Sequence, residues 1–250
     1  MSDPSRPIPA IIPFYKNQRQ LDLCKAALEK QDLPTEPWVY DNSVNNLYFT
    51  KAVNKGLRRA IHEGHEFAIS LNQDCYLRSD ATRNMVEFMR SHPRCGIAGI
   101  KQVLARDEDQ IVHGGCTMAY PTGYHVVGRK SLGDCTVNAR MPWVNGACVI
   151  VRVDAMLDFG VMDENMLLVA SDSDWCYSAR AHNWEVWYCA TAECVHEMGV
   201  SFSKQNPELT KIMVSDMAFW AEKWIGSSLH ARLEAEFRPL SSIGPNVRLG

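Results

Sequence analysis

The sequence lacks the patterns that mark membrane proteins, exported proteins and proteins that coat nucleic acids. No apolar stretch approaches the length of about 20 residues that a membrane-spanning helix needs. The opening residues MSDPSRP lack the charged-then-apolar order of a signal peptide. The 26 basic residues are balanced by 29 acidic ones and form no run longer than a pair, which argues against a polyanion-binding surface. We therefore expect a cytoplasmic protein.

Two common phosphate-binding motifs are also missing. The sequence contains no G-x-x-x-x-G-K-[ST], and no G-x-G-x-x-G follows a predicted strand. A kinase, ATPase or dehydrogenase function therefore has no local support.

The cysteines show no pairing pattern. There are nine, an odd number, and they lie in apolar stretches with no C-x-x-C and no regular spacing. This pattern is typical of buried free thiols in a reducing compartment, so neither a disulfide framework nor a zinc site is expected.

Length and composition are ordinary for one globular domain. The chain has 250 residues, of which 46% are hydrophobic and 22% charged, and its net charge is -3. These values exclude disordered, collagen-like and coiled-coil classes. No internal repeat, low-complexity tract or linker divides the chain, so we expect a single domain over residues 1–250.

Short apolar runs alternate with amphipathic stretches along the chain. The predicted strands are residues 9–14, 38–40, 67–71, 95–100 and 147–153, with 186–189 as an edge strand. The predicted helices are residues 18–30, 49–62 and 172–182, and one from a cap at Ser79 or Asp80 through Arg90. This alternation predicts an α/β fold with a mostly parallel central sheet flanked by helices. The glycine-rich stretch 102–142 is expected to be a loop over the sheet.

Acidic side chains follow several predicted strands. Asp41 and Asp74 stand at the carboxyl ends of strands, where open α/β sheets bind ligands. Asp172, Asp174 and His196 also flank apolar segments. Carboxylates that converge with an imidazole suit a divalent cation that bridges phosphates. The simpler alternative is a helix cap or turn for each aspartate and a hydrogen-bonded core histidine for His196.

A series of short motifs runs from about residue 8 to residue 224. It comprises DNS at 41–43, NLYFTKAVNKG at 46–56, LNQD at 71–74, WVNGA at 143–147, Arg152, GVMDE at 160–164, SDSDWC at 171–176, VH at 195–196, GVS at 199–201 and DMAFWAEKW at 216–224. In content and order the series resembles the motifs of family 2 glycosyltransferases, particularly the rhamnosyltransferase-like branch. The stretch 102–142 has no counterpart.

The resemblance implies a GT-A fold and a single glycosyltransferase domain, with a core at about 8–224 and a helical extension at 225–250. It implies an enzyme that transfers a hexosyl or deoxyhexosyl group from a UDP- or dTDP-linked sugar, with inversion and with Mn2+ or Mg2+ as cofactor. The acceptor would be a hydroxyl group of a glycan, a lipid-linked glycan or another molecule, as in polysaccharide biosynthesis.

The resemblance also implies roles for individual residues. Asp172 occupies the position of the general base. The metal ligands would be Asp74 and His196. The donor-binding positions are Pro13, Tyr15, Asp41, Asn54, Asn72, Asp74 and Gly146. Trp143 and Asp174 would contact the acceptor or orient neighbouring groups, with core packing an equal alternative for Trp143.

The sequence departs from the family pattern at four places. Asn72 replaces the first acidic residue of the metal motif, so metal affinity should be modest. Ser171 replaces a glutamate before the base, and residues 166–168 (MLL) replace an aromatic pair, which would alter base orientation or acceptor selectivity. Tyr48 replaces a glycine and would narrow the site.

Two other functions stay open. One is a catalytically degenerate nucleotide-sugar binding module, with Ser171 as the mark of lost catalysis. The other is a glycosyltransferase that modifies nucleic acid, which the pI of 6.2 disfavours.

Two further stretches have alternative interpretations. One predicted helix face carries four apolar residues: Trp220, Trp224, Ile225 and Leu229. Packing of this face on the domain is the simpler interpretation, and contact with a membrane surface or a partner is the alternative. The motif HGG at 113–115 predicts a turn, with close backbone approach to a donor sugar as the alternative.

Overall fold

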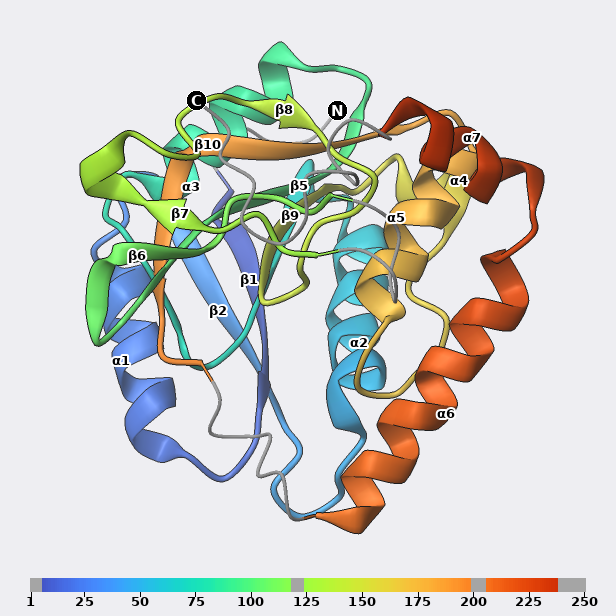
Figure 1. Cartoon of the computed structure of the whole chain (residues 1–250). Coiled ribbons are helices and arrows are strands. Elements are labelled where there is room, and N and C mark those ends of the chain that lie inside the picture. Colours follow the sequence, from blue (N-terminus) through green and yellow to red (C-terminus); the bar gives the residue numbers. More distant parts are fainter. Residues whose placement is uncertain (1–5, 118–123, 199–205, 238–250) are drawn as a thin grey trace.

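Within residues 6–117, 124–198 and 206–237, which the computed structural model describes, ten strands form one sheet with helices on both faces (Figure 1). In chain order the elements are β1 (Ile8–Phe14), α1 (Gln18–Glu29), β2 (Thr35–Asp41), α2 (Tyr48–Glu63), β3 (Phe67–Leu71), β4 (Cys75–Leu77), α3 (Ala81–Ser91), β5 (Cys95–Leu104), β6 (Asp107–His113), β7 (Gly128–Arg129), η1 (Lys130–Leu132), β8 (Ala139–Arg140), β9 (Cys148–Arg152), α4 (Met156–Phe159), α5 (Ser171–Ala181), β10 (Glu185–His196), α6 (Pro207–Trp224) and α7 (Ser228–Glu236).

The central sheet is mixed but has one dominant strand direction. Its order is β2-β1-β3-β9-β5-β10-β4. β2, β1, β3, β5 and β10 point one way, while β9 runs antiparallel to both of its neighbours and β4 antiparallel to β10. The predicted α/β fold with a mostly parallel sheet is therefore confirmed, and the antiparallel insertion of β9 is the feature that the sequence pattern did not indicate.

Two local predictions were wrong. The strand predicted at the edge is the 12-residue β10, which lies between β5 and β4. Polar Glu193 interrupts its apolar pattern, yet the Glu193 Oε1 accepts from Arg78 Nε at 3.1 Å and pairs with Lys130 Nζ at 2.9 Å. The stretch 102–142 is also not only loop, because β5 extends to Leu104 and pairs with β6 in an antiparallel hairpin.

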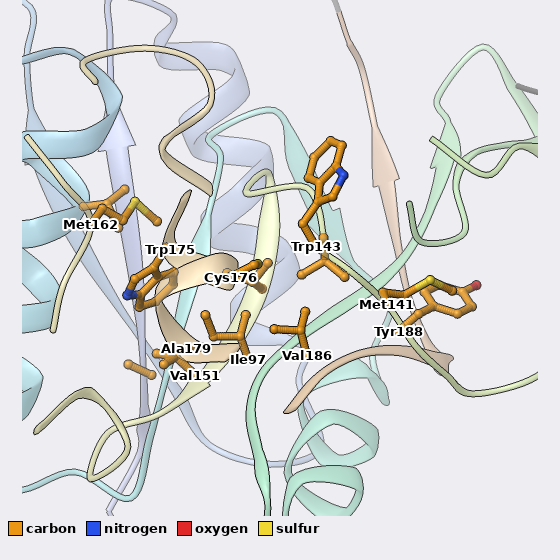
Figure 2. Packing of buried hydrophobic residues seen from close by; sticks show 14 of the residues in the cluster. Ile97, Met141, Trp143, Val151, Met162, Trp175, Cys176, Ala179, Val186 and Tyr188 are labelled. Carbon is orange, nitrogen blue, oxygen red and sulfur yellow. The ribbon is translucent and has the colours of Figure 1, made fainter. Parts of the chain in front are cut away.

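Alternating side chains on the strands create two apolar faces. In β1, Ile11 points into one core cluster, and Ala10 and Ile12 point into the other. Helices α2 and α5 cover the first face, and helices α1 and α3 cover the second. Figure 2 shows the first face, where Trp175, Cys176 and Ala179 of α5 lie near Ile97 and Val151 of the sheet. This packing fixes the start of α5 over the carboxyl ends of the strands.

The C-terminal segment forms two helices that pack on the domain. Gly226, with a φ of +85°, separates α6 from α7. Trp220 and Leu229 are buried in a cluster with Tyr177 of α5, whereas Ile225 is 51% exposed. The expectation of one continuous helix face is therefore wrong, and packing on the domain is confirmed for Trp220 and Leu229. No helix in the described residues is both long and apolar enough to cross a membrane.

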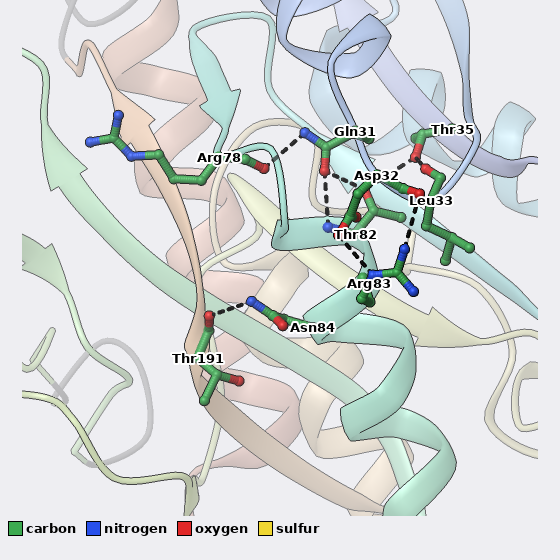
Figure 3. Close-up of polar contacts among 9 residues, drawn as sticks. All are labelled: Gln31, Asp32, Leu33, Thr35, Arg78, Thr82, Arg83, Asn84 and Thr191. Carbon is green, nitrogen blue, oxygen red and sulfur yellow. Dashed lines mark hydrogen bonds and ion pairs between the residues drawn. The ribbon is translucent and has the colours of Figure 1, made fainter.

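A side chain from outside α3 caps that helix. Thr82 donates its backbone N–H to Gln31 Oε1 at 3.0 Å and its hydroxyl to the same atom at 2.8 Å (Figure 3). Gln31 Nε2 donates to the Arg78 carbonyl at 2.8 Å. Asp80, which with Ser79 was one of two expected caps of α3, occupies the N-cap position but makes no side-chain cap bond. Gln31 therefore joins the end of α1 to the start of α3.

We expect Gln31→Ala to destabilise the fold by about 1–2 kcal/mol, because it removes a helix cap and leaves partly buried backbone groups without partners. Thermal unfolding of the purified variant measures this. Asp80→Ala is the matched control and should change the unfolding free energy by less than about 0.5 kcal/mol. The assignment of the cap is wrong if Asp80→Ala is the more damaging change.

Candidate active site

Asp74 and His196 meet at the edge of the sheet where β3 ends. β4 pairs antiparallel with β10, and the register places Cys75 opposite His196. Asp74 Oδ2 lies 3.5 Å from His196 Nε2. With Cys75, these residues bring one potential ligand atom each within 4.8 Å of one another. The structure therefore brings together the two residues predicted as metal ligands.

A chain of amides orients the imidazole ring of His196. Asn145 Oδ1 accepts the Ala147 N–H at 2.9 Å and the Gln102 Nε2 at 3.2 Å. Gln102 therefore presents Oε1 to His196 Nδ1, at 2.9 Å. An acceptor at this position places the ring proton on Nδ1 and leaves Nε2, on the side of Asp74, with the lone pair that a metal needs. Sequence reasoning missed Gln102 and Asn145 because neither carries a charge.

The contact with Asp74 also controls the protonation of His196. Burial lowers the pKa of His196, but the hydrogen bond and the negative charge of Asp74 outweigh burial, so the net pKa is raised above its ordinary value. A cation bound by both side chains would replace that proton.

Asp172 lies at the start of α5, and backbone groups hold both of its oxygens. Oδ2 accepts the Gly146 N–H at 2.8 Å, and Oδ1 accepts the Ser173 N–H at 2.8 Å. A Cβ on residue 146 would lie 3.0 Å from the Asp172 Cβ and 3.2 Å from Phe49 Cζ, so glycine allows this close approach. Gly146 binds Asp172, and its neighbour Asn145 binds Gln102, which contacts His196. The segment 145–147 therefore connects Asp172 to His196.

The environment of Asp172 favours proton uptake. Burial raises the pKa of the Asp172 carboxyl above its ordinary value, although hydrogen bonds from the backbone of Gly146 and Ser173 act in the opposite direction. A carboxylate with a raised pKa is a better proton acceptor near neutral pH. Asp172 is therefore a carboxylate whose surroundings favour its protonated form, held in one orientation by two backbone N–H groups.

Two of the predicted donor-binding residues, Tyr15 and Asp41, lie beside the edge of the sheet that holds Asp74. Gln73, the neighbour of Asp74, accepts the Tyr15 N–H at 2.6 Å and donates Nε2 to the Tyr15 carbonyl at 3.4 Å. The Tyr15 side chain is 43% exposed. Asp41 ends β2 in an exposed position, where its Oδ1 accepts the Ser43 N–H at 2.7 Å and the Ser43 hydrogen bonds lower its pKa. The Asx turn is confirmed for Asp41, and nucleotide contact stays a prediction.

The remaining donor-binding positions differ in their surroundings. Pro13 lies in β1 opposite Tyr40 of β2. Asn72 follows β3, and its backbone N–H donates to the Ala147 carbonyl at 2.8 Å, which ties the end of β3 to β9. Gly146 lies against Asp172, as described above. These three positions flank the same edge of the sheet.

Asn54 has a structural role, contrary to the prediction. It is fully buried, and its Oδ1 accepts the Met162 N–H at 3.0 Å. Its Nδ2 donates to the Met162 carbonyl at 2.8 Å and to Glu164 Oε1 at 3.0 Å. Asn54 and Glu164, which belong to two separate motifs, thus clamp α2 to the segment before α5. The engaged amide is not available to a donor sugar.

Neither Trp143 nor Asp174 faces the site. Trp143 is 3% exposed and packs in the core with its ring 5.5 Å from that of His125. The packing interpretation is therefore correct, and stacking on a sugar is wrong. Asp174 Oδ1 accepts from Trp224 Nε1 at 2.7 Å and pairs with Lys223 Nζ at 2.8 Å, so it fastens α6 to α5.

Asp216 is a buried organising residue that sequence reasoning did not single out. Its two carboxylate oxygens accept the backbone N–H groups of residues 167–169 at 2.7 to 3.0 Å. The side chain is almost fully buried, with 1% of Asp216 exposed. The segment that it holds leads directly into Asp172. The signal was the DMAFWAEKW motif, whose Asp216, Lys223 and Trp224 all bind the region around α5.

Two departures from the family pattern have visible consequences. Ser171 Oγ accepts from Thr50 Oγ1 at 2.8 Å, so a buried hydroxyl pair joins α5 to α2 where the family has a glutamate. Tyr48 has a φ of +58°, a conformation that favours glycine. A glycine would adopt this backbone conformation without strain, and this chain holds a tyrosine there instead.

A hollow of about 490 Å³ lies beside His196. Its lining comes from the β5–β6 hairpin and the residues after β10: Leu104, Arg106, Gln110, Val112, Glu197 and Met198. It offers a mixed apolar and charged surface next to the predicted metal ligands.

Solved structures share the fold over nearly the whole chain. GalNAc-T7, in a structure with UDP, GalNAc and Mn2+, superposes with a TM-score of 0.63 and 14% sequence identity over 96% of this chain. TarS from S. aureus, residues 1–349 with UDP-GlcNAc, superposes with a TM-score of 0.60 and 16% identity over 96% of this chain and 74% of that one. The fold is that of the GT-A glycosyltransferases.

The likeness is structural and covers part of the larger proteins. The chain spans 51% of the GalNAc-T7 structure and 44% of a longer TarS structure. No family model and no curated protein matches the sequence. At these identities the comparison shows the fold, and the chemistry has to be argued from the site itself.

Proposed function

We propose that this chain transfers a sugar from a UDP- or dTDP-linked donor to a hydroxyl acceptor, with inversion at the anomeric carbon. One observation carries the proposal: on a GT-A sheet, the pair Asp74 and His196 and the held carboxylate of Asp172 lie at one edge and share the segment 145–147. UDP and a UDP-sugar in the structures of GalNAc-T7 and TarS support a nucleotide-sugar donor.

The residues present fit a divalent cation. Asp74 supplies a carboxylate oxygen, and His196 supplies an imidazole nitrogen whose proton Gln102 directs to the far side of the ring. An imidazole ligand favours a transition ion such as Mn2+ over Mg2+. When bound, the ion would neutralise the charge on the diphosphate leaving group.

Asp172 would act on the acceptor. As the acceptor oxygen bonds to the anomeric carbon and the bond from that carbon to the diphosphate breaks, an Asp172 oxygen takes the hydroxyl proton. The N–H groups of Gly146 and Ser173 keep the carboxylate in one orientation. A single displacement of this kind inverts the configuration of the sugar.

The raised pKa of Asp172 predicts the pH dependence. The base works when ionised, so kcat/KM should fall on the acid side with an apparent pKa above 3.8, the ordinary value for aspartate, because burial disfavours the charged form. The effect on stability has the opposite sign: the raised pKa stabilises the fold at low pH, and this contribution is lost as the pH rises through the folded-state pKa. Initial rates from pH 4 to 8 measure the acid limb. An acid limb at or below the ordinary aspartate value contradicts the assignment.

The proposal is tested by release of nucleoside diphosphate from UDP-, dTDP- and GDP-sugars in the presence of Mn2+ or Mg2+. We expect turnover of one donor, with loss of activity in Asp74→Ala. Binding of a donor without turnover, even when hydroxyl acceptors are supplied, would favour the degenerate binding module. Salt-sensitive binding of DNA would favour the nucleic-acid-modifying alternative.

A further inference from the structure

A second group of potential metal ligands lies in the stretch that has no counterpart among the family motifs. The Nδ1 atoms of His113 and His125 are 3.0 Å apart. Cys116 Sγ lies 3.9 Å from the first and 3.8 Å from the second. The three atoms thus form a compact triangle of two imidazole nitrogens and one sulfur.

The backbone is shaped to bring these three side chains together. His113 ends β6, and two glycines, Gly114 and Gly115, separate it from Cys116, three positions later. Gly115 has a φ of +100°, and a Cβ on Gly114 would lie 2.3 Å from Cys135 Sγ, so side chains are excluded at both positions. An antiparallel bridge between Cys116 and His125 places the third group opposite.

The distances match those of a tetrahedral metal centre. With metal–nitrogen bonds of about 2.05 Å and a metal–sulfur bond of about 2.3 Å, tetrahedral ligands lie about 3.3 Å apart for two nitrogens and about 3.6 Å apart for nitrogen and sulfur. The observed nitrogen–nitrogen distance of 3.0 Å and the nitrogen–sulfur distances of 3.8 and 3.9 Å each differ from these ideal separations by about 0.3 Å. Small side-chain adjustments would therefore complete the geometry.

Burial directs the polar atoms of this group toward one another. His113 is 1% exposed, and its Nε2 is buried without a hydrogen-bond partner in the described residues, so the ring makes its polar contacts through Nδ1. The atoms that His113 Nδ1 faces are His125 Nδ1 and Cys116 Sγ.

We propose that His113, Cys116 and His125 bind a zinc-like divalent cation. Two imidazoles and a thiolate are ligands that Zn2+ and Co2+ accept readily and that Mg2+ avoids. Binding releases the thiol proton of Cys116, and the fourth coordination position falls to water or another small ligand. The cysteine pattern predicted no zinc site because no C-x-x-C is present, whereas the ligands proposed here follow H-x-x-C and a later histidine. This group shares no ligand with Asp74 and His196, and the inference does not depend on the proposed function.

The test is titration of the purified, chelator-treated full chain with Co2+, followed by absorption spectroscopy. We expect one equivalent to produce a thiolate-to-cobalt charge-transfer band and tetrahedral d–d bands, and Zn2+ to displace both. Cys116→Ser should lose the charge-transfer band, and His125→Ala should weaken binding at least tenfold, an expectation scaled from losses of 10–100-fold for outer-shell partners.

Cys75→Ser is the matched control, because Cys75 is the thiol that lies beside Asp74 and His196. It should keep the band, as should Asp74→Ala. Unfolding curves without metal show whether each variant folds. Zn2+ should raise the melting temperature of the wild type and of Cys75→Ser more than that of Cys116→Ser or His125→Ala, which keep only the site at Asp74 and His196. Absence of a thiolate band in the wild type, or its loss in Cys75→Ser with retention in Cys116→Ser, overturns the proposal.

Discussion

Asp172→Asn is expected to lower kcat by about 10²–10⁴-fold, the usual contribution of a positioned general base. The amide cannot take the acceptor proton, although it occupies the same space between Gly146 and Ser173. Donor affinity should stay near that of the wild type, because the substitution leaves Asp74 and His196 in place. Steady-state rates and calorimetric donor binding separate the two effects.

Asp174→Asn is the matched control for this prediction. It stands two residues further along α5, and its carboxylate pairs with Lys223 and Trp224 rather than with the segment before β9. We expect it to lower the melting temperature while kcat changes much less than in Asp172→Asn. Equal losses of kcat in folded samples of both variants would remove Asp172 from the role of base.

Asp216→Ala is expected to destabilise the protein by about 3–5 kcal/mol, because three backbone N–H groups in a buried segment lose a charged acceptor. For a chain of this size that corresponds to a fall of about 10 °C in melting temperature. Activity should fall as well, since residues 167–169 lead into Asp172. Thermal unfolding and initial rates, measured on the same preparation, check both effects.

Two comparisons sharpen the Asp216 prediction. Glu222→Ala removes an exposed carboxylate from the same helix and should change stability by less than about 0.5 kcal/mol. Asp216→Asn keeps one acceptor oxygen, so its loss of stability should lie between those of Glu222→Ala and Asp216→Ala. A melting temperature of Asp216→Ala within 2 °C of the wild type contradicts the assigned role.

The sequence predicted the elements of the domain better than their relations. Local periodicity predicted α1 and β3. Helix α1 buries one face, and strand β3 buries all of its side chains. The direction of β9 and the central position of β10 depend on pairings between strands far apart in the sequence. Periodicity describes which side chains are buried, and it does not report the partner strand.

The candidate site was predictable where a charged residue ends an element. Asp74 follows a strand and His196 ends one, and Asp172, predicted from the motif resemblance, lies in the first turn of a helix. Their roles in binding and catalysis stay predictions, and the structure connects Asp172 and His196 through segment 145–147. Asn54 was misassigned because a buried amide that binds backbone groups and an amide that binds a sugar look alike in a motif. The partners of Asn54 are Met162 and Glu164, which lie 108 and 110 positions away in the loop after α4.

Other parts of the site had no readable signal. Gln102 acts on His196 from a stretch that was expected to be loop, and its contribution depends on the oxygen of an uncharged amide. The HGG motif was interpreted as a turn, and Gly115 has a φ of +100°, which favours glycine, but the approach of His125 to His113 requires the tertiary structure.

The central claim is that Asp74 and His196 hold a divalent cation against the diphosphate of the donor. Calorimetric titration of UDP and dTDP, with and without Mn2+, tests it most directly in the wild type, Asp74→Ala and His196→Ala. We expect Mn2+ to strengthen nucleotide binding to the wild type and to have no effect on either variant, while binding without metal is similar in all three. A full Mn2+ effect in both folded variants would contradict the claim.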